Sequence, residues 1–233
     1  MNPYSLTIYK SPFTKIRLGK DNDGGYVFSD IPNVNYSVLI AGGIDRDVSF
    51  ENDFVKKYPN TKCYAFDGTI STLPDFSSDI TFIKKNIGGE NTEKMTNLHD
   101  IIDEHECIFI KMDIEGDEIP WINSLSSEQM NKFDQIVIEF HGPFSYNEKF
   151  IFDKINRQHY LVHLHGNNCR EIICYNGFFM PTLFECTYLH KKYFTSKPEF
   201  NTDPIPSELD MPNVVSREDI HINYPPFVYP KFL

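Results

Sequence analysis

Short hydrophobic runs rich in Val, Ile and Phe alternate with polar, helix-compatible stretches from residue 34 onward. This alternation is typical of a parallel sheet whose strands are joined by crossover helices. The pattern predicts five strands, at residues 36–42, 62–67, 80–86, 107–113 and 133–141. Between them it predicts helices at residues 47–58, 95–105 and 119–132, and a short turn at 69–76.

The pattern changes after the fifth strand. A helix is predicted over residues 148–158, followed by strands at 159–166 and 183–191 that are joined by an Asn- and Gly-rich segment, 167–179. These last two strands predict an antiparallel pair at one edge of the sheet. The predicted fold class is therefore α/β, with a Rossmann-like sheet.

The two ends of the chain differ from this core. Residues 1–33 predict a hairpin extension in which Gly24 and Gly25 supply the turn. Residues 197–233 contain frequent prolines, which exclude regular helix and interior strand, so we expect a tail that wraps around the core. At 233 residues, the whole chain is predicted to be a single domain with its core at 34–196.

Composition narrows the classes of partner. A net charge of −11 argues against nucleic acid, because binding to phosphate backbones depends on clustered Lys and Arg. No hydrophobic run approaches the ~20 residues of a membrane span, and the N-terminus lacks the pattern of a signal peptide. Five cysteines without metal-type spacing predict reduced, mostly buried thiols in a cytoplasmic protein: Cys63, Cys107, Cys169, Cys174 and Cys186.

The loop after the first predicted strand consists of small residues. Ala41, Gly42 and Gly43 precede Asp45, and small residues let a ligand approach the backbone closely. In open α/β sheets, ligands bind beyond the carboxyl ends of the strands, which is where this loop is expected. The pattern is not GxGxxG, so the residues alone leave two interpretations open, a cofactor loop or a tight strand-to-helix turn.

The next two predicted strands end in groups suited to a nucleoside. Asp67 ends the second strand and Gly68 follows it, where nucleoside-binding folds place an acidic residue that binds the ribose hydroxyls. Its distance of about 25 residues from the glycine loop fits that spacing. The third strand ends near Asn86 and Gly88, where an adenine ring is expected. A strand-ending Asp that only opens a turn is the alternative.

Charged residues gather at the ends of the fourth and fifth predicted strands. Lys111, Asp113 and Glu115 follow the fourth strand, and Glu139 and His141 end the fifth. Neighbouring parallel strands would bring these side chains to one rim. Such a set suits proton abstraction or the binding of a hard cation.

Nearby residues have a simpler interpretation. Asp117 and Glu118 are expected to form the solvated first turn of the next helix, where the helix dipole favours acidic side chains.

His165 lies in the sequence HLHGNN, with His163 on the same face of the strand and two amides after it. For His165 both a structural role and a role in binding a hydroxyl-bearing ligand remain open.

Several of these motifs resemble FkbM-type methyltransferases. The segment IFIKMDIEGDE is similar to the "lKiDvEGaE" signature of that family, and FDQIVIEFH is similar to the strand that follows it. YSVLIAGGID resembles the S-adenosylmethionine loop of class I methyltransferases, CYAFD their ribose-binding strand and FIKKNIGG the strand near the adenine. The glycine loop departs from the family pattern, because AGGID stands where many members have DxGxxxG.

The resemblance implies a seven-stranded class I fold that binds S-adenosylmethionine at Gly42, Gly43 and Asp67. It also implies methyl transfer to a hydroxyl of a sugar, glycan or natural product, with Asp113, Glu115 and His141 lining the acceptor site. Some related sugar methyltransferases bind a divalent cation, such as Mg²⁺ or Mn²⁺, at carboxylates that end the fourth and fifth strands, and the resemblance implies Asp113, Glu139 and His141 as the candidate metal ligands here. The resemblance therefore implies a sugar or glycan acceptor and leaves the need for a cation, and the oligomeric state, open.

A mechanism follows as a hypothesis. The enzyme would align an acceptor oxygen with the methyl group and remove its proton, with His141 or His165 as the general base or with a cation that acidifies the hydroxyl. Two other functions compete. One is a non-catalytic module that binds carbohydrate or protein, and the other is a nicotinamide-dependent oxidoreductase, which the missing GxGxxG motif disfavours.

Overall fold

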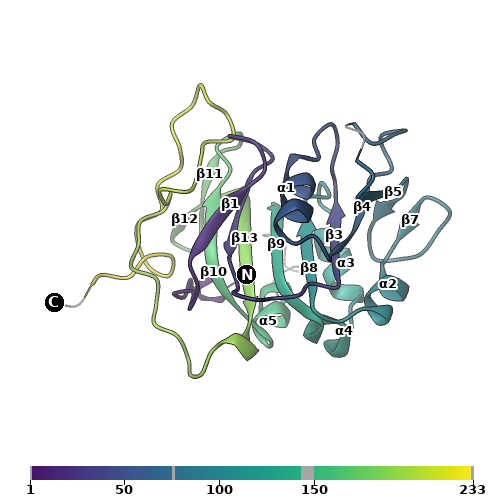
Figure 1. The fold of residues 1–233 in the computed structure, drawn as a ribbon. Helices are drawn as coiled ribbons and strands as arrows, with labels where there is room; N and C mark the ends of the chain where they lie inside the picture. The colour runs from purple at the N-terminus through teal and green to yellow at the C-terminus, as the bar shows by residue number, and fades with distance from the viewer. Residues whose placement is uncertain (1, 75–76, 143–149, 232–233) are drawn as a thin grey trace.

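A mixed seven-stranded sheet forms the centre of the computed structural model, which describes residues 2–74, 77–142 and 150–231 (Figure 1). Its strand order is β10-β13-β9-β8-β3-β4-β5. Strands β5, β4, β3, β8 and β9 are parallel, whereas β13 runs antiparallel to both β9 and β10. The strands are β3 (Val38–Gly42), β4 (Lys62–Phe66), β5 (Ile80–Ile83), β8 (Ile108–Met112), β9 (Phe133–His141), β10 (His159–Gly166) and β13 (Leu183–His190). The predicted seven-stranded α/β sheet is confirmed.

Two hydrophobic clusters cover the two faces of this sheet. Along β3, Val38 and Ile40 belong to one cluster and Leu39 and Ala41 to the other, as the alternation of side chains in a strand requires. The first cluster also contains side chains of α2, α3, α4 and α5, and the second those of α1 and the N-terminal hairpin. The helices are α1 (Ser49–Lys57), α2 (His99–Glu104), α3 (Glu118–Ser124), α4 (Ser127–Asn131) and α5 (Ile151–Asn156). The sheet is therefore buried on both faces.

The N-terminal hairpin packs beside this sheet. Its strands β1 (Lys15–Leu18) and β2 (Tyr26–Ser29) pair in antiparallel register, and Gly24 in the connection has φ +94°. The hairpin lies across β13 and β10 in Figure 1. Thr187 of β13 donates a hydrogen bond to the Val27 carbonyl, and Gln135 of β9 bonds the backbone of Ser29. The hairpin thus covers the part of one sheet face where the polar side chains of Gln135 and Thr187 lie.

Several element boundaries differ from the sequence prediction. The predicted strand 80–86 ends at Ile83, and the predicted helix 95–105 begins only at His99. Between them, short strands β6 (Asn86–Ile87) and β7 (Met95–Thr96) pair with each other. The predicted single helix 119–132 is two helices, because Ser126 and Gln129 form a capping box that starts α4.

The segment 167–179, predicted as a connection, contributes to a hairpin of β11 (Ile172–Tyr175) and β12 (Phe178–Pro181). Single-turn 3-10 helices occur at Pro3–Leu6 and Lys191–Tyr193. The predicted turn at 69–76 and helix at 148–158 both extend outside the described residues. The described part of the helix is α5.

Residues 197–231 form neither helix nor extended strand pairing beyond one bridge between Tyr9 and Phe200. This segment, yellow in Figure 1, runs past β12, β11 and β10. It is anchored by buried side chains, among them Ile205, Ile222 and Phe227. It therefore packs against the core along much of its length.

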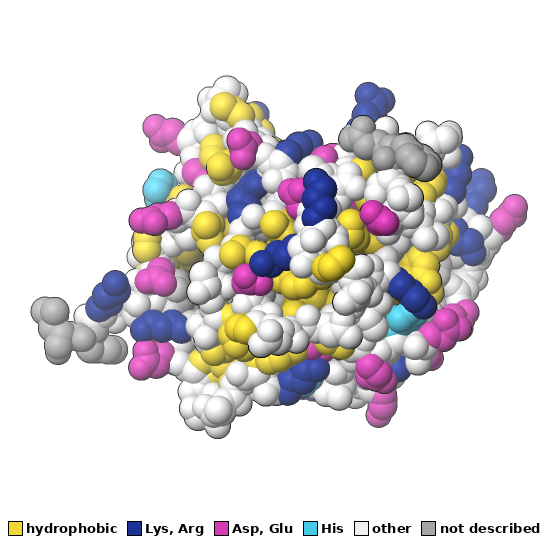
Figure 2. All heavy atoms as spheres, viewed as in Figure 1, with side chains coloured by type: hydrophobic (Ala, Val, Ile, Leu, Met, Phe, Trp, Pro, Cys, Tyr) yellow, Lys and Arg dark blue, Asp and Glu magenta, His cyan; other side chains and the backbone are white. Residues whose placement is uncertain are grey.

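The surface and the cysteines complete the picture. Acidic and basic side chains are interspersed over the face shown in Figure 2. Among the described helices, none is long and apolar enough to cross a bilayer. All five cysteines are free, but only Cys63 and Cys186 are buried. The expectation of mostly buried thiols is therefore wrong for the other three, which lie in loops or on the β11 hairpin.

Candidate cofactor and metal site

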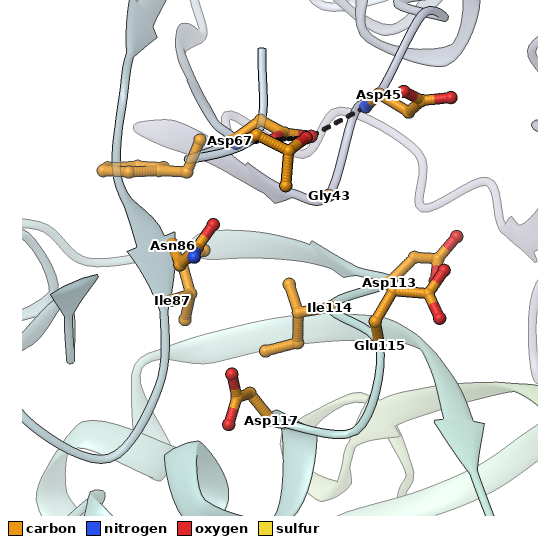
Figure 3. Close-up of a pocket in the computed structure, with 11 residues that line it drawn as sticks. Gly43, Asp45, Asp67, Asn86, Ile87, Asp113, Ile114, Glu115 and Asp117 are labelled. Carbon is orange, nitrogen blue, oxygen red and sulfur yellow. Dashed lines mark hydrogen bonds between the residues drawn. The ribbon is translucent and has the colours of Figure 1, made fainter. Parts of the chain in front are cut away.

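A pocket of about 390 Å³ lies at the carboxyl ends of β3, β4 and β8 (Figure 3). Gly43 and Asp67 line one side, and the loop Asp113 to Asp117 lines the other. The parallel order of these strands explains the meeting, because their carboxyl ends reach the same edge of the sheet. The volume is within the range of about 300–1,000 Å³ that small-molecule pockets occupy.

Asp67 is held as a buried anion at the end of β4. Its Oδ2 accepts a hydrogen bond from the Asp45 backbone N–H at 2.9 Å, and its Oδ1 accepts from the N–H and the hydroxyl of Thr69 at 2.7 and 2.5 Å. Burial opposes the charge, but these hydrogen bonds outweigh it and lower the pKa of Asp67. Asp67 therefore stays an anionic acceptor facing the pocket.

The glycine loop is shaped by close backbone contacts. Gly43 has φ +70°, and a Cβ built there would lie 1.5 Å from the Asp113 carbonyl oxygen, so no other residue fits without displacing the loop. Lys111 reaches the same place from β8, and its Nζ donates to the Gly43 carbonyl at 2.9 Å. Lys111 is 5% exposed, so its buried side chain supports the glycine loop from β8.

Asp113, Glu139 and His141 form a cluster at the ends of β8 and β9. One ligand atom from each lies within 4.8 Å of the others. His141 Nε2 is 3.8 Å from Asp113 Oδ1 and 4.0 Å from Glu139 Oε2. Two ligands bound at about 2.1 Å to one ion are at most about 4.2 Å apart, so both separations suit a shared cation. The cluster has the donor set of a divalent metal site.

The carboxylate of Asp113 is only partly paired. Its Oδ2 accepts from the Tyr26 hydroxyl at 3.3 Å. Its Oδ1 is buried and meets no N–H or hydroxyl donor among the described residues, and the protonated form of Glu139 is hydrogen-bonded to the Asp113 carboxylate. Once Glu139 is ionised, two buried carboxylates face each other, and this arrangement fits an additional positively charged ligand.

The protonated form of Glu139 is favoured in this arrangement. Burial, and then the charges of Asp113 and Glu185, raise its pKa well above the ordinary value. Its Oε1 accepts a 2.7 Å hydrogen bond from Asn167. A cation bound beside Asp113 would remove the reason for this proton, so cation binding and deprotonation of Glu139 are coupled.

Glu118 orients His141 and the loop. Its side chain is fully buried, and Oε1 accepts from His141 Nδ1–H at 3.0 Å and from the Ile114 N–H at 3.0 Å. Both carboxylate oxygens also face the Gly116 N–H. The expectation of a solvated Glu118 is wrong, because its buried carboxylate holds the backbone N–H groups of the loop 114–116. Its hydrogen bond to His141 Nδ1–H leaves His141 Nε2 as the nitrogen that faces Asp113 and Glu139.

The pKa of His141 is raised. Burial lowers it, but the hydrogen bond to Glu118 and the charges of Glu118, Asp113 and Glu115 raise it more. The imidazole is therefore protonated more readily than a free histidine. Because a histidine binds a metal through a neutral imidazole, a cation at this site would take the place of the proton on Nε2.

His165 lies in a different environment. Its Nε2 donates to Asp219 of the tail at 3.0 Å, and its Nδ1 lies 3.6 Å from Glu185. Burial is outweighed by these two carboxylates, which raise the pKa of His165 to about 10. The residue is 2% exposed and is not among the residues that line the pocket of Figure 3.

The other residues singled out from the sequence are distributed around the pocket. Asp45 and Asn86 line it directly. Ala41 is fully buried in β3, and Gly88 packs against Met95. Gly42 faces Ile87, Met112 and Ile114, and the N–H of Gly68 donates to Asn86 Oδ1 at 2.9 Å. The side chain of Glu115 is 85% exposed and lies 3.4 Å from His141 Nε2.

Sequence reasoning missed several residues of the site. Thr69, Phe66, Ile114 and Asp117 line the pocket, and Tyr26 reaches Asp113 from the N-terminal hairpin. The threonine two residues after Asp67 was a usable signal, because short side chains there often bond a preceding Asp. Nothing in the local sequence predicted the contact of Tyr26, which is 87 residues from Asp113.

The mixed α/β sheet, with its pocket and carboxylates at the strand ends, is the framework of a cofactor-binding enzyme. The chain matches the methyltransferase FkbM domain over residues 9–170, more than half of its length, and it belongs to that family. The match contains β3 to β10 and ends before β11, β12, β13 and the tail. No curated protein matches the chain.

Proposed function

We propose that this chain is an S-adenosylmethionine-dependent O-methyltransferase that transfers a methyl group to a hydroxyl of a sugar or glycan. The main support is that Gly43, Asp67 and Asp113 line one pocket in a chain of the FkbM methyltransferase family. The acceptor class rests on the carboxylates and amides around Asp113, which suit sugar hydroxyls.

The residues of the pocket fit the cofactor. Asp67 would bind the ribose hydroxyls through Oδ2, which accepts a single hydrogen bond from the described residues, and its lowered pKa keeps it charged. Phe66, Ile87 and Ile114 offer an apolar wall for the adenine ring. When bound, S-adenosylmethionine supplies a methyl carbon attached to a positively charged sulfur, which is a strong electrophile.

Asp113, Glu139 and His141 would hold Mg²⁺ or Mn²⁺ beside this pocket. The spacing of the three ligand atoms supports the assignment, as does the buried Asp113 Oδ1, which meets no N–H or hydroxyl donor in the described segments. A bound cation would lower the pKa of an acceptor hydroxyl. In its absence the raised pKa of His141 makes the imidazole a weak candidate for the base, so the cation is the favoured route.

Removal of the acceptor proton then depends on the residues around the cation. Asn167 and Glu118 hold Glu139 and His141 in place, which limits the geometry in which a hydroxyl can approach. His165 is a poor general base in this proposal, because its imidazole is enclosed by Asp219 and Glu185 and keeps its proton.

A thermal-shift screen tests the cofactor. S-adenosylhomocysteine, the product form of the cofactor, should raise the melting temperature, and Asp67→Asn should weaken its binding about 10-fold in calorimetry through the loss of a charged hydrogen bond. Stabilisation by NAD instead would favour an oxidoreductase. Stabilisation by neither would favour a non-catalytic binding module and would contradict the proposal.

A second assay tests the acceptor and the cation. Methyl transfer to a panel of monosaccharides and glycans should require Mg²⁺ or Mn²⁺ and should stop with EDTA. Apparent metal affinity should increase with pH, because the raised pKa values of Glu139 and His141 mean that protons compete with the cation at lower pH. Full activity in EDTA would remove the metal from the proposal and leave the cofactor assignment intact.

A further inference from the structure

A second, smaller cavity of about 130 Å³ adjoins the cofactor pocket. Gly43, Asp45 and Asp113 line both, and they lie at the edge of the pocket drawn in Figure 3. The smaller cavity continues from this edge between the glycine loop, α1 and the N-terminal hairpin. One elongated ligand can therefore occupy the pocket and reach into the cavity.

Glu51 is the unusual residue of this cavity. It lies in the first turn of α1 and is 1% exposed. Its Oε1 is buried and has no hydrogen-bond partner in the described segments. Burial raises its pKa, while the nearby Lys111 acts in the opposite direction. A hydrogen bond from its own backbone N–H also lowers the pKa, but burial outweighs both effects. A buried carboxyl group with one oxygen lacking a donor costs stability, so it is expected where a ligand supplies that donor.

Nearby cationic groups are already engaged or exposed. Lys111 Nζ donates to the Gly43 carbonyl, and Lys20 forms an ion pair with Asp47 at 3.2 Å. Arg46 also lines the cavity, but its residue is exposed. The cavity therefore presents a buried carboxyl group, that of Glu51, with a cationic side chain at its outer edge, as a ligand with both an ammonium and a carboxylate requires.

The sequence of the glycine loop adds an independent reason. Ala41-Gly42-Gly43-Ile44-Asp45 has an apolar residue where the family pattern DxGxxxG begins with an acid. Ala41 is fully buried in β3 and has no polar side chain to offer. A buried carboxyl group lines this cavity from α1 instead, ten residues further along the chain, in Glu51.

We propose that Glu51 is a positioning residue that binds the ammonium group of the methionine portion of S-adenosylmethionine, in place of an acid at the end of β3. The inference rests on the proposed function. The ammonium group has three N–H donors, and Glu51 Oε1 is the acceptor that lacks one. By fixing this end of the cofactor, Glu51 would hold the sulfur and its methyl group toward Asp113.

Binding calorimetry separates this role from a structural one. The ligands are S-adenosylhomocysteine, which carries the ammonium group, and 5′-methylthioadenosine, which lacks the amino-acid portion. Glu51→Gln should bind S-adenosylhomocysteine about 10- to 100-fold more weakly and 5′-methylthioadenosine with less than about a 2-fold change. The matched control Glu106→Gln removes the same charge from an exposed loop and should leave both affinities unchanged.

Stability provides a second readout. Without ligand, Glu51→Gln should melt at the same temperature or higher, because it removes a buried carboxylate that lacks a partner. If Glu51→Gln does not fold, Glu51→Asp keeps the charge on a shorter side chain. That variant should lose affinity for S-adenosylhomocysteine selectively, by a smaller factor.

The outcomes distinguish this inference from the proposed function. If wild type binds S-adenosylhomocysteine and Glu51→Gln binds it equally well, Glu51 has no role toward the ammonium group. Equal losses for both ligands would show a general effect on the pocket and would also overturn the inference. If wild type binds neither ligand, the proposed cofactor itself is wrong and the inference fails with it.

Discussion

Two histidines at the ends of neighbouring strands show how differently the same residue is used. His141 ends β9 and His165 lies near the end of β10, and carboxylates raise the pKa of both. His165 has an acidic partner at each nitrogen, Asp219 and Glu185, and is enclosed by the tail. His141 is hydrogen-bonded to Glu118 through Nδ1, and its Nε2 lies 3.4 Å from the exposed Glu115 and 3.8 and 4.0 Å from Asp113 and Glu139.

The difference shows which of the two histidines has a ring nitrogen that can bind a ligand. A histidine whose two nitrogens are both satisfied by carboxylates contributes stability and resists any change of charge. A histidine anchored through one nitrogen, with its second nitrogen facing several carboxylates, has the arrangement in which the proposed cation would bind. Among the described residues, four carboxylates lie within 4.0 Å of the His141 nitrogens and two within 4.0 Å of those of His165, and only the first arrangement suits the proposed ligand.

Exchanging each histidine for glutamine tests the comparison most strongly. His141→Gln should lower methyl transfer roughly 10³-fold while the melting temperature changes little, because it removes a proposed metal ligand. His165→Gln should destabilise the fold by about 3 kcal/mol, because it leaves Asp219 without its cationic partner. Turnover per folded molecule should stay near that of wild type. The reverse pattern of activity and stability would exchange the two roles.

The pH dependence of stability should report on His165. Its pKa is raised from 6.5 to about 10 in the folded protein, so the ion pair stabilises fully below about pH 6.5 and is lost as the pH rises toward 10. The difference in unfolding free energy between wild type and Asp219→Asn should therefore shrink over this range. Chemical denaturation at pH 6, 8 and 10 measures it. A constant difference would mean that the imidazole is not protonated.

Glu118→Gln should weaken the site without removing a ligand. The amide cannot act as the same charged acceptor for His141 Nδ1–H, so affinity for Mn²⁺ should fall about 10- to 100-fold. The pKa of His141 should also fall, since Glu118 is the main group that raises it. Calorimetry and an NMR titration measure these effects, with Glu128→Gln on α4 as the exposed control. Unchanged metal affinity would show that Glu118 only closes the loop.

The smallest effect is expected for Glu115→Gln. Although Glu115 lies 3.4 Å from His141 Nε2, its side chain is 85% exposed, and exposed ion pairs contribute about 0–1 kcal/mol. Turnover should therefore change less than about 3-fold in a steady-state assay. A loss of turnover as large as that of His141→Gln would make Glu115 part of the reacting centre. An exposed carboxylate would then matter as much as the partly buried His141.

Much of the framework could be predicted from local pattern. Hydrophobic runs fill β3 and parts of β8 and β9 because these strands are buried on both faces. Their parallel order then places Gly43 and Asp113 at one edge, together with Asp67 of β4. Element boundaries were less accurate, because the capping box at Ser126 and the pairing of β6 with β7 interrupt otherwise helix-like or strand-like segments.

By itself, the sequence determined which residues form the central strands and which acids follow their carboxyl ends, because side-chain alternation and strand-end position are local properties. Only the tertiary structure decided that Glu118 is buried against His141, that Asp219 encloses His165 from 54 residues away, and that Glu51 faces a cavity without a partner. Those outcomes depend on which distant segments pack together, and packing sets the burial and pairing of each charge.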